Sequence, residues 1–385
     1  MFWLNLLILT VFVAGHTELM VTLVNRAHAI PIHHDRLRHV RHVHDLTLVA
    51  FPPLLLWFVG VRGPGVLVGG SWSDMSPVLA AYLALCTMGA GGLLISIVRW
   101  LASSTPSVQI SNHSRVVDIE QRLGERPLGE GPFRWLTHVP GNEIFRVQVS
   151  EKVSRPPRLP AEWDGLSILH LTDMHFYGTL DRRFFEEVTD LGAEMDPDLI
   201  VFTGDLVDNL RLLDWLPSTL GKLKAPLGCY FILGNHDWYL DPDEIRRQVR
   251  ELGWHDVASR TLCVEHRGHT LALGGTERPW MGAHPNWSAV PDDAFRLLLS
   301  HTPDHIGWAR TQQVDLMLSG HNHGGQVVLP LFGPVYTPSR YGTRYAGGVY
   351  WEDPTLLYVS RGISGRHPLR LGCPPELTKL VLRSR

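Results

Sequence analysis

Five short apolar runs after residue 165 each end in residues that can bind a metal ion. The residues after these runs are carboxylates, an amide and imidazoles, and none is a cysteine. Oxygen and imidazole donors without a thiolate are the ligands expected for a catalytic Mn, Fe or Zn ion. The candidate ligands are Asp173, His175, Asp205, Asn235, His301, His321 and His323. Metal-assisted chemistry is therefore the first reaction class that the sequence indicates.

The runs before these residues have the length and composition of buried β-strands. They are Leu166–Leu171, Leu199–Phe202, Tyr230–Leu233, Leu297–Leu299 and Val314–Leu318. Amphipathic helices are predicted between several of them, over Asp181–Glu194 and from Asp241 to Gly253. Strand–helix alternation predicts the α/β fold class with covered sheets, in which residues beyond the carboxyl ends of strands converge in one crevice. One such motif alone would be an ordinary turn or helix cap, but five together indicate a site.

The motifs at these strand ends form a recognisable series. They are Asp173/His175, Gly204–Asp208, Gly234–Asp237, His301 and Gly320–His323. This order of D-x-H, G-D-x-x-D, G-N-H-D, a lone histidine and G-H-x-H resembles the calcineurin-like metallophosphoesterases. The stretches SGHNHGGQVVLP and LYVSRGISGRHPLR are similar to the membrane-associated bacterial branch of that family. The resemblance covers residues 165–383 and implies a double β-sandwich flanked by helices, with two metal ions where the strand ends meet.

The resemblance also implies a ligand set for each of two divalent ions, whose identity as Mn, Fe or Zn stays open. One ion is expected on Asp173, His175, Asp205 and His323. The other is expected on Asp205, Asn235, His301 and His321, so that Asp205 bridges the two. Paired divalent ions lower the pKa of a water and clamp the attacking and leaving oxygens, so a metal-activated hydroxide is expected to attack phosphorus.

His236 and Asp237 are the predicted catalytic residues. In the family, the histidine of G-N-H-D contacts phosphate and helps the leaving group depart, and here that histidine is His236. We expect Asp237 to fix the tautomer of His236 and to favour its protonated form, because a carboxylate beside an imidazole does both.

Two arginines after the last metal motif, Arg361 and Arg344, are predicted to contact the substrate, because guanidinium groups bind phosphate bidentately. The alternative is that they form surface ion pairs in a chain whose 35 basic residues include 31 arginines. The aromatic stretch from Arg278 to Trp287 is interpreted either as a lid or bilayer-facing lip, or as a packed insertion.

The first 104 residues carry 10 charged side chains, whereas the remaining 281 carry 63. Three apolar stretches lie in this region, Met1–Val24, Leu46–Val61 and Met75–Val98. Since about 20 apolar residues cross a bilayer as a helix, they predict about three transmembrane helices, and the lack of a basic n-region favours an uncleaved anchor over a signal peptide. We therefore divide the chain into a membrane anchor over 1–104, a connector with an edge strand over 105–165, and a metallophosphoesterase domain over 166–385.

The arginines of the anchor predict its orientation. Arg26, Arg36, Arg38 and Arg41 lie between the first two stretches, and Arg99 follows the third. Because basic segments stay in the cytoplasm, the protein is predicted to be a multi-pass cell-membrane protein with a cytoplasmic catalytic domain. The histidines between 28 and 44 are interpreted either as a metal-gathering or pH-sensing patch, or as part of a solvated loop that sets topology.

Together these observations predict a membrane-anchored, metal-dependent phosphoric ester hydrolase. Its expected substrate is a phosphodiester, pyrophosphate or phosphomonoester in a phosphorylated small molecule or a lipid. A net charge of −3 argues against nucleic acid as a partner, because nucleic-acid binders need a basic surface. The alternatives are a nuclease or cyclic-nucleotide phosphodiesterase, and a non-catalytic metal-binding membrane scaffold, although a scaffold has no use for His236. The sequence does not indicate an oligomeric state.

Overall fold

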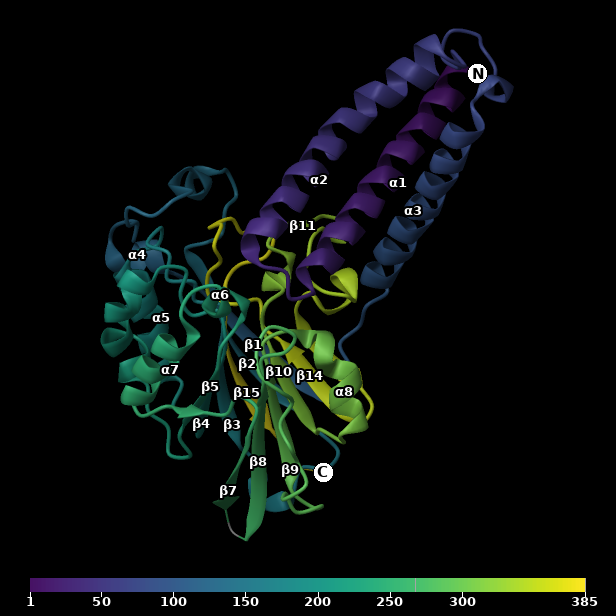
Figure 1. Cartoon of the computed structure of the whole chain (residues 1–385). Coiled ribbons are helices and arrows are strands. Elements are labelled where there is room, and N and C mark those ends of the chain that lie inside the picture. Colours follow the sequence, from purple (N-terminus) through teal and green to yellow (C-terminus); the bar gives the residue numbers. More distant parts are fainter. Residues whose placement is uncertain (267, 385) are drawn as a thin grey trace. The chain divides into compact units, whose positions relative to one another are not determined.

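The computed structural model describes residues 1–266 and 268–384 and divides into two compact units (Figure 1). The helical unit comprises Met1–Ser103 together with Pro330–Arg344. The sheet unit comprises Ser104–Leu329 and Tyr345–Arg385. Residues 330–344, which the sequence analysis assigned to the domain over 166–385, therefore belong with the N-terminal helices.

Two mixed β-sheets build the sheet unit. The first has the strand order β1 (Gln109–Asp118), β2 (Arg146–Ser154), β15 (Glu376–Leu382), β3 (Ser167–Leu171), β4 (Leu199–Thr203), β5 (Cys229–Ile232) and β6 (His255–Asp256). The second has the order β13 (Gly348–Glu352), β14 (Thr355–Val359), β10 (Leu316–Ser319), β9 (Phe295–Ser300), β8 (His269–Thr276) and β7 (Thr261–His266). The strands β3 to β6 are parallel, and so are β8, β9, β10 and β14. All five predicted strands lie in these parallel blocks, which confirms the α/β fold class.

The two sheets pack face to face around a buried apolar layer. Ile168 and Val201 from the first sheet share this layer with Leu297 and Leu318 from the second. The next residue in β3, Leu169, belongs to a different cluster because successive strand side chains point to opposite faces. A continuous apolar run is what a strand buried on both faces requires.

Helices cover the outer faces of both sheets. The predicted helices are present as α5 (Arg182–Glu194) and α7 (Pro242–Glu251). Both pack on the first sheet through an apolar stripe, which contains Phe184 and Val188 in α5, and Ile245 and Val249 in α7. The short helix α8 (Ile306–Thr311) packs on the second sheet through Ala309. This helix–sheet–sheet–helix layering confirms the double β-sandwich that the family resemblance implied. Shorter elements are α4 (Ile119–Leu123), α6 (Asn235–Trp238), the 3-10 helix η8 (His323–Gly325), β11 (Val328–Leu329) and β12 (Gly333–Pro334).

The connector contributes two strands to the first sheet. The predicted strand over Glu143–Val153 is present as β2, but it is internal because β1 pairs with it antiparallel and β15 pairs with it on the other side. The edge strand is β1, which the sequence analysis did not predict. Its residues, QISNHSRVVD, are mostly polar and exposed, so β1 lacks the apolar alternation by which strands are recognised.

Three helices of the helical unit are long and apolar enough to cross a membrane. They are α1 (Phe2–His28), α2 (His34–Leu55), which continues as the π-helical segment η1 (Leu56–Arg62), and α3 (Pro77–Leu101). A Cβ atom on Gly15 would lie 1.7 Å from the carbonyl oxygen of Cys86, and one on Gly89 would lie 2.3 Å from that of Gly15. Small residues therefore let the backbones of α1 and α3 approach closely, as in membrane helix pairs.

The second helix begins earlier than its apolar run. The predicted loop from Arg26 to Asp45 is helical except at residues 29–33, so Arg36, Arg38 and Arg41 lie on α2. Arginine and leucine are good helix formers, and a membrane helix can continue past the bilayer surface as a polar helix. Both interpretations of the histidine-rich stretch stay predictions.

Candidate metal centre

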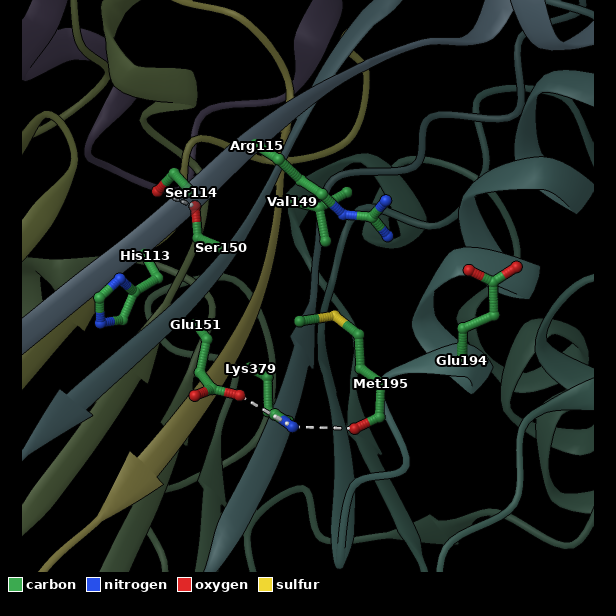
Figure 2. A pocket seen from close by; sticks show the side chains of 9 residues that line it. All are labelled: His113, Ser114, Arg115, Val149, Ser150, Glu151, Glu194, Met195 and Lys379. Atoms are coloured by element: carbon green, nitrogen blue, oxygen red, sulfur yellow. Dashed lines mark hydrogen bonds and ion pairs between the residues drawn. The ribbon is translucent and has the colours of Figure 1, made fainter.

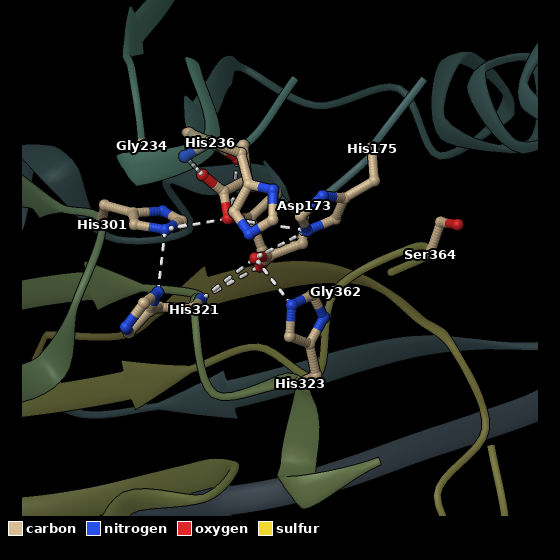
Figure 3. Close-up of polar contacts among 12 residues, drawn as sticks. Asp173, His175, Gly234, His236, His301, His321, His323, Gly362 and Ser364 are labelled. Carbon is tan, nitrogen blue, oxygen red and sulfur yellow. Dashed lines mark hydrogen bonds and ion pairs between the residues drawn. The ribbon is translucent and has the colours of Figure 1, made fainter. Parts of the chain in front are cut away.

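The seven predicted ligands all follow strands of the parallel blocks. Asp173 and His175 follow β3, Asp205 follows β4, and Asn235 begins α6 after β5. The second sheet supplies the others, because His301 follows β9 and both His321 and His323 follow β10. The carboxyl ends of the two blocks meet at one edge of the sandwich, and side chains from both sheets turn toward one another there (Figure 3). The structure thus brings together residues up to 150 positions apart in the sequence.

The backbone at this edge is held in an uncommon conformation. Five of the ligands have left-handed φ angles, with values of 56° at Asp173, 47° at His175, 57° at Asp205, 69° at His321 and 49° at His323. Non-glycine residues in this region cost about 1–2 kcal/mol each, and such strain clusters at functional sites. The surrounding packing therefore holds these side chains in an arrangement that the local sequence does not favour.

The first predicted ligand group is compact. Ligand atoms of Asp173, His175, Asp205 and His323 all lie within 4.8 Å of one another. The Nε2 atom of His175 is 3.5 Å from Asp205 Oδ2, and that of His323 is 3.5 Å from Asp173 Oδ1. Among the described residues, His175 Nε2 is a buried polar atom without a hydrogen-bond partner. A buried imidazole nitrogen without a partner, between two carboxylates, is what a metal ligand requires.

The second group shares Asp205 with the first. Ligand atoms of Asp205, His301 and His321 also lie within 4.8 Å of one another. His301 Nε2 is 3.3 Å from Asp205 Oδ2, 3.1 Å from His321 Nδ1 and 3.1 Å from the side-chain oxygen of Asn235. The residues present therefore fit two divalent ions, with Asp205 as the residue common to both positions.

Hydrogen bonds from the protein leave a nitrogen of two of these histidines for a metal. The Nδ1 atom of His301 lies 2.7 Å from the carbonyl oxygen of Thr203, and that of His175 lies 2.8 Å from Asp208 Oδ2. Since each Nδ1 then carries the proton, each Nε2 presents a lone pair to the centre. These two hydrogen bonds therefore leave Nε2 of each ring as the nitrogen that would bind a metal.

His236 lies beside the ligand cluster, and its side chain is more exposed to solvent than those of His175 and His301. Its side chain is 20% exposed, whereas those of His175 and His301 are 1% and 0% exposed. Its Nδ1 atom is 2.6 Å from Asp208 Oδ1. Burial alone lowers the pKa of His236, but the negative charges of Asp208 and Asp205 outweigh this and raise it to about 9. The imidazole is thus held in its protonated form at neutral pH.

The structure corrects the expected role of Asp237. Its carboxylate does not contact the His236 ring but accepts hydrogen bonds from backbone N–H groups of Gly234, Asp205, Leu206 and Val207, at 2.9–3.1 Å. The carboxylate that orients His236 is Asp208, the last residue of the G-D-x-x-D motif. Adjacent residues on a helical turn point in different directions, so Asp237 faces the preceding loop instead. It fixes the two turns that carry Asp205 and Asn235.

Neither arginine predicted to contact the substrate lies free in the centre. The Arg361 Nε atom is 3.3 Å from Glu376 Oε2, and its side chain is 20% exposed. Arg344 lies in Pro330–Arg344, which belongs to the helical unit. Both roles stay predictions.

Two other arginines contact this region more directly. Arg370 is fully buried and donates to the carbonyl oxygens of His323, at 2.9 Å, and Ser364. Arg366 lies over the Tyr177 ring, and its positive charge opposes the rise in the pKa of His236. Both lie in the motif GRHPLR, but nothing local distinguishes them from the chain's other arginines.

The aromatic stretch from Arg278 to Trp287 is a packed insertion. Trp280 and Trp287 are each only 6% exposed. The Trp280 ring lies 5.0 Å from the His321 ring and 5.7 Å from that of His301. The interpretation as a bilayer-facing lip is therefore wrong, since both tryptophans face the interior and one of them forms a wall beside two ligand histidines.

A cavity of about 400 Å³ lies elsewhere on the sheet unit (Figure 2). It is lined by His113, Ser114, Arg115, Val149, Ser150, Glu151, Glu194, Met195 and Lys379, none of which is a predicted ligand. The ammonium group of Lys379 is already bound, at 2.9 Å from the carbonyl oxygen of Met195 and 3.0 Å from Glu151. At this wall of the cavity, the lysine is therefore held by the protein itself.

Comparison with known proteins agrees with this geometry. The sequence profile of the calcineurin-like phosphoesterases matches residues 166–325. The chain is 32% identical to the metallophosphoesterase YkuE of Bacillus subtilis (strain 168), over 63% of this chain and 87% of that protein. It is 30% identical to the phosphodiesterase YaeI of Escherichia coli (strain K12), over 56% and 81%.

A third relative is similar at lower identity. It is the UDP-2,3-diacylglucosamine pyrophosphatase LpxG of Chlamydia muridarum (strain MoPn / Nigg), 25% identical over 63% of this chain and 90% of that protein. With matches of this extent, and with every motif residue gathered at one edge of a double β-sandwich, the chain belongs to the calcineurin-like metallophosphoesterases, a family of metal-dependent phosphoric ester hydrolases.

Proposed function

We propose that this protein is a membrane-anchored phosphoesterase that hydrolyses a phosphodiester or pyrophosphate bond in a lipid-linked molecule at the bilayer surface. The observation that carries the proposal is the position of Asp205. Its carboxylate belongs to both ligand groups, and within each group the ligand atoms all lie within 4.8 Å of one another. A carboxylate shared by two sets of oxygen and imidazole donors is suited to hold two divalent ions side by side.

Each group of residues would contribute separately. When bound, divalent ions supply a water of low pKa and neutralise charge on the phosphate oxygens. Asp173, His175, Asp205 and His323 would hold one ion, and Asp205, Asn235, His301 and His321 the other. The buried Trp280 ring and the buried strand ends would exclude bulk water from the site, which strengthens the charge interactions there.

His236 would act on the leaving group. Its Nδ1 atom is occupied by Asp208, so the proton available to a substrate is on Nε2. With a pKa of about 9, the ring carries that proton at neutral pH and can donate it to a departing oxygen. Its backbone N–H donates to Asp205 Oδ1 at 2.9 Å, which ties the acid to the shared ligand.

Two features support a substrate at the membrane. Three helices are long and apolar enough to span it, and the relative LpxG is named for a diacylated pyrophosphate substrate. The arginines near the ends of α1 and α3, Arg26 and Arg99, support the orientation with the sheet unit in the cytoplasm. A diester that is not lipid-linked is the second candidate, because the relative YaeI is named as a phosphodiesterase.

The test of the shared ligand is Asp205→Asn in purified full-length protein. We expect it to lose most bound metal, measured by mass spectrometry of the metals, together with Mn-dependent hydrolysis of a nitrophenyl phosphodiester. The matched control is Asp190→Asn, which removes an exposed carboxylate paired with Lys222 and should change neither. If Asp205→Asn keeps two metal equivalents per chain, the shared role is refuted. If the unaltered protein hydrolyses no phosphoric ester, the enzymatic proposal is refuted.

A further inference from the structure

A segment far from the N-terminus in sequence packs with the N-terminal helices. Residues Pro330–Arg344 belong to the helical unit. The backbone N–H of Thr337 donates to the side-chain oxygen of Asn25 at 3.3 Å, a contact across 312 positions, and the Tyr336 ring lies 5.9 Å from that of His28. On the other helix, the hydroxyl oxygens of Ser96 and Thr343 are 3.5 Å apart. The segment is therefore built against both α1 and α3.

All these contacts lie at the same end of the helices. Asn25 and His28 lie in the last turn of α1, and Ser96 and Trp100 lie in the last two turns of α3. A helix of 27 residues is about 40 Å long at 1.5 Å per residue, whereas the hydrocarbon core is about 30 Å thick. The last turns of a spanning helix therefore reach the headgroup zone.

The residues at this end are those that membrane interfaces favour. Arg26 and Arg99 lie in the last turns of α1 and α3, followed by Trp100, which is 36% exposed. A Cβ atom on Gly333 would lie 2.7 Å from Trp100 Cγ, so the backbone of the segment lies directly on the indole ring. Tryptophan and arginine mark the bilayer–water boundary, which places Gly333 at that depth.

The part of the segment beside Gly333 exposes bulky apolar side chains. Leu331 is 70% exposed, Phe332 is 55% exposed and Val335 is 39% exposed. Leu331 also has a left-handed φ of 68°, a conformation unfavourable for leucine by about 1–2 kcal/mol. Contiguous apolar side chains held out from the protein mark an interaction surface.

We infer that residues 330–344 form a lip that inserts Leu331 and Phe332 into the headgroup zone of the bilayer, and that the enzyme takes its substrate from that lipid surface. The inference deepens the proposed function, on which it rests for the substrate. The bilayer is the occupant that the location requires, because the same segment is packed on the interfacial ends of the spans. Arg340 and Arg344 add positive charge to it, which favours anionic lipid.

The chain enters and leaves the lip close in sequence to the last metal motif. The segment begins seven residues after His323. Where the chain leaves it, the carbonyl oxygen of Tyr345 accepts from the side chain of Asn322 at 2.7 Å, and that of Ala346 accepts from the N–H of Gly324 at 3.0 Å. The two residues flanking the ligand His323 are thus bonded to the base of the lip.

The depth of the lip can be measured without catalysis. A nitroxide is attached at Leu331→Cys in full-length protein that also carries Cys263→Ser, and the protein is reconstituted in vesicles containing a third phosphatidylglycerol. The control is the protein labelled at Cys263, since this cysteine is exposed on the sheet unit and the other three are buried. We expect power-saturation EPR to show more collision with oxygen than with an aqueous nickel chelate at 331, and the reverse at 263. A nitroxide at 331 that is as accessible to the chelate as the one at 263 would overturn the inference. A nitroxide at 331 that collides little with either oxygen or the chelate would overturn it as well, because another protein would then cover the segment.

The activity test separates this inference from the proposed function. The double variant L331D/F332D should lose at least about tenfold in hydrolysis of a bilayer-embedded phosphodiester, because tenfold corresponds to less free energy than burying one leucine side chain. It should hydrolyse a soluble nitrophenyl phosphodiester within about twofold of the unaltered protein. The control V116D changes an exposed residue of β1 and should leave both activities unchanged. Equal loss on both substrates would refute the lip, whereas inactivity of the unaltered protein would refute the proposed function and leave the EPR result intact.

Discussion

At the scale of single residues, the candidate centre depends on Asp208 as much as on the ligands. One oxygen of this carboxylate contacts His175 Nδ1 at 2.8 Å and the other contacts His236 Nδ1 at 2.6 Å. Burial raises the pKa of Asp208, but the two imidazoles outweigh it and hold the pKa well below the usual range. A single ionised carboxylate therefore orients a ligand and an acid together, and sets the distance between them.

The role of His236 can be tested by substitution with an uncharged residue. His236→Gln should retain both metals and a similar KM but lose about 10²–10⁴-fold in kcat, the usual contribution of a general acid. The loss should be largest with poor leaving groups and smaller with nitrophenolate, which departs without a proton. Metal content and kcat across a series of leaving groups measure this.

Asp208→Asn gives the companion measurement. It removes the charge that holds the proton on His236, so this variant should also hydrolyse substrates with poor leaving groups more slowly. If His236→Gln removes a metal, the histidine is a ligand. If it slows all leaving groups equally, the histidine positions phosphate and is not the acid.

At the scale of elements, the C-terminal strand β15 joins the connector to the strands of the centre. It pairs with β2 on one side and with β3 on the other. Its first residue, Glu376, is buried and lies 3.0 Å from Lys152 Nζ on β2 and 3.3 Å from Arg361 Nε. This buried ion pair network fixes β15 beside the strand that leads to Asp173.

The network predicts how stability depends on pH. Burial raises the pKa of Glu376, but Arg361 and Lys152 outweigh it and lower it to about 2. Because the folded-state pKa is depressed, the stabilisation is complete above the unfolded value of about 4.3 and is lost as pH falls toward 2, amounting to about 3 kcal/mol. Glu376→Gln should lower the melting temperature at pH 7 and flatten its decline between pH 5 and pH 2, as followed by circular dichroism.

The control for this prediction is Glu151→Gln. Its partner Lys379 lies 3.0 Å away, but the carboxylate is 42% exposed, and surface pairs contribute below about 1 kcal/mol. If the melting temperature declines equally between pH 5 and pH 2 in the unaltered protein and in Glu376→Gln, the ion pairs of Glu376 do not contribute to stability.

At the scale of the whole molecule, the two units are interleaved in sequence. The sheet unit starts at Ser104 and is interrupted by the segment 330–344 of the helical unit. All seven predicted ligands lie in the sheet unit.

This organisation predicts where the chain can be divided. A fragment from Ser104 onward should keep its metals and hydrolyse a soluble diester within about threefold of the full chain, because β1 still covers β2. A fragment from residue 140 lacks β1, and its exposed β2 edge should cause aggregation, measured by size-exclusion chromatography. Loss of soluble activity in a folded Ser104 fragment would show that the helices shape the centre.

The sequence by itself determined the ligand-bearing strand ends, the fold class and the three apolar helices. It could do so because these depend on local features, namely apolar runs of a given length and donor residues immediately after them. Parallel strands then bring their carboxyl ends together whatever the loops between them do. The G-N-H-D and G-H-x-H motifs were identifiable for the same reason, since each lies within four residues.

Only the tertiary structure decided which side chains act on one another across the fold. Asp208 rather than Asp237 reaches His236, because helical geometry turns adjacent residues to different sides and the choice depends on two loops from different strands. The buried Arg370 contacts His323 from 47 positions away, and the polar strand β1 forms only because β2 offers it an edge. For the stretch from Arg278 to Trp287, the sequence left a lid, a bilayer-facing lip and a packed insertion open, and the burial of Trp280 and Trp287 favours the packed insertion. Burial and long-range contact depend on the whole packed chain, so no local pattern encodes them.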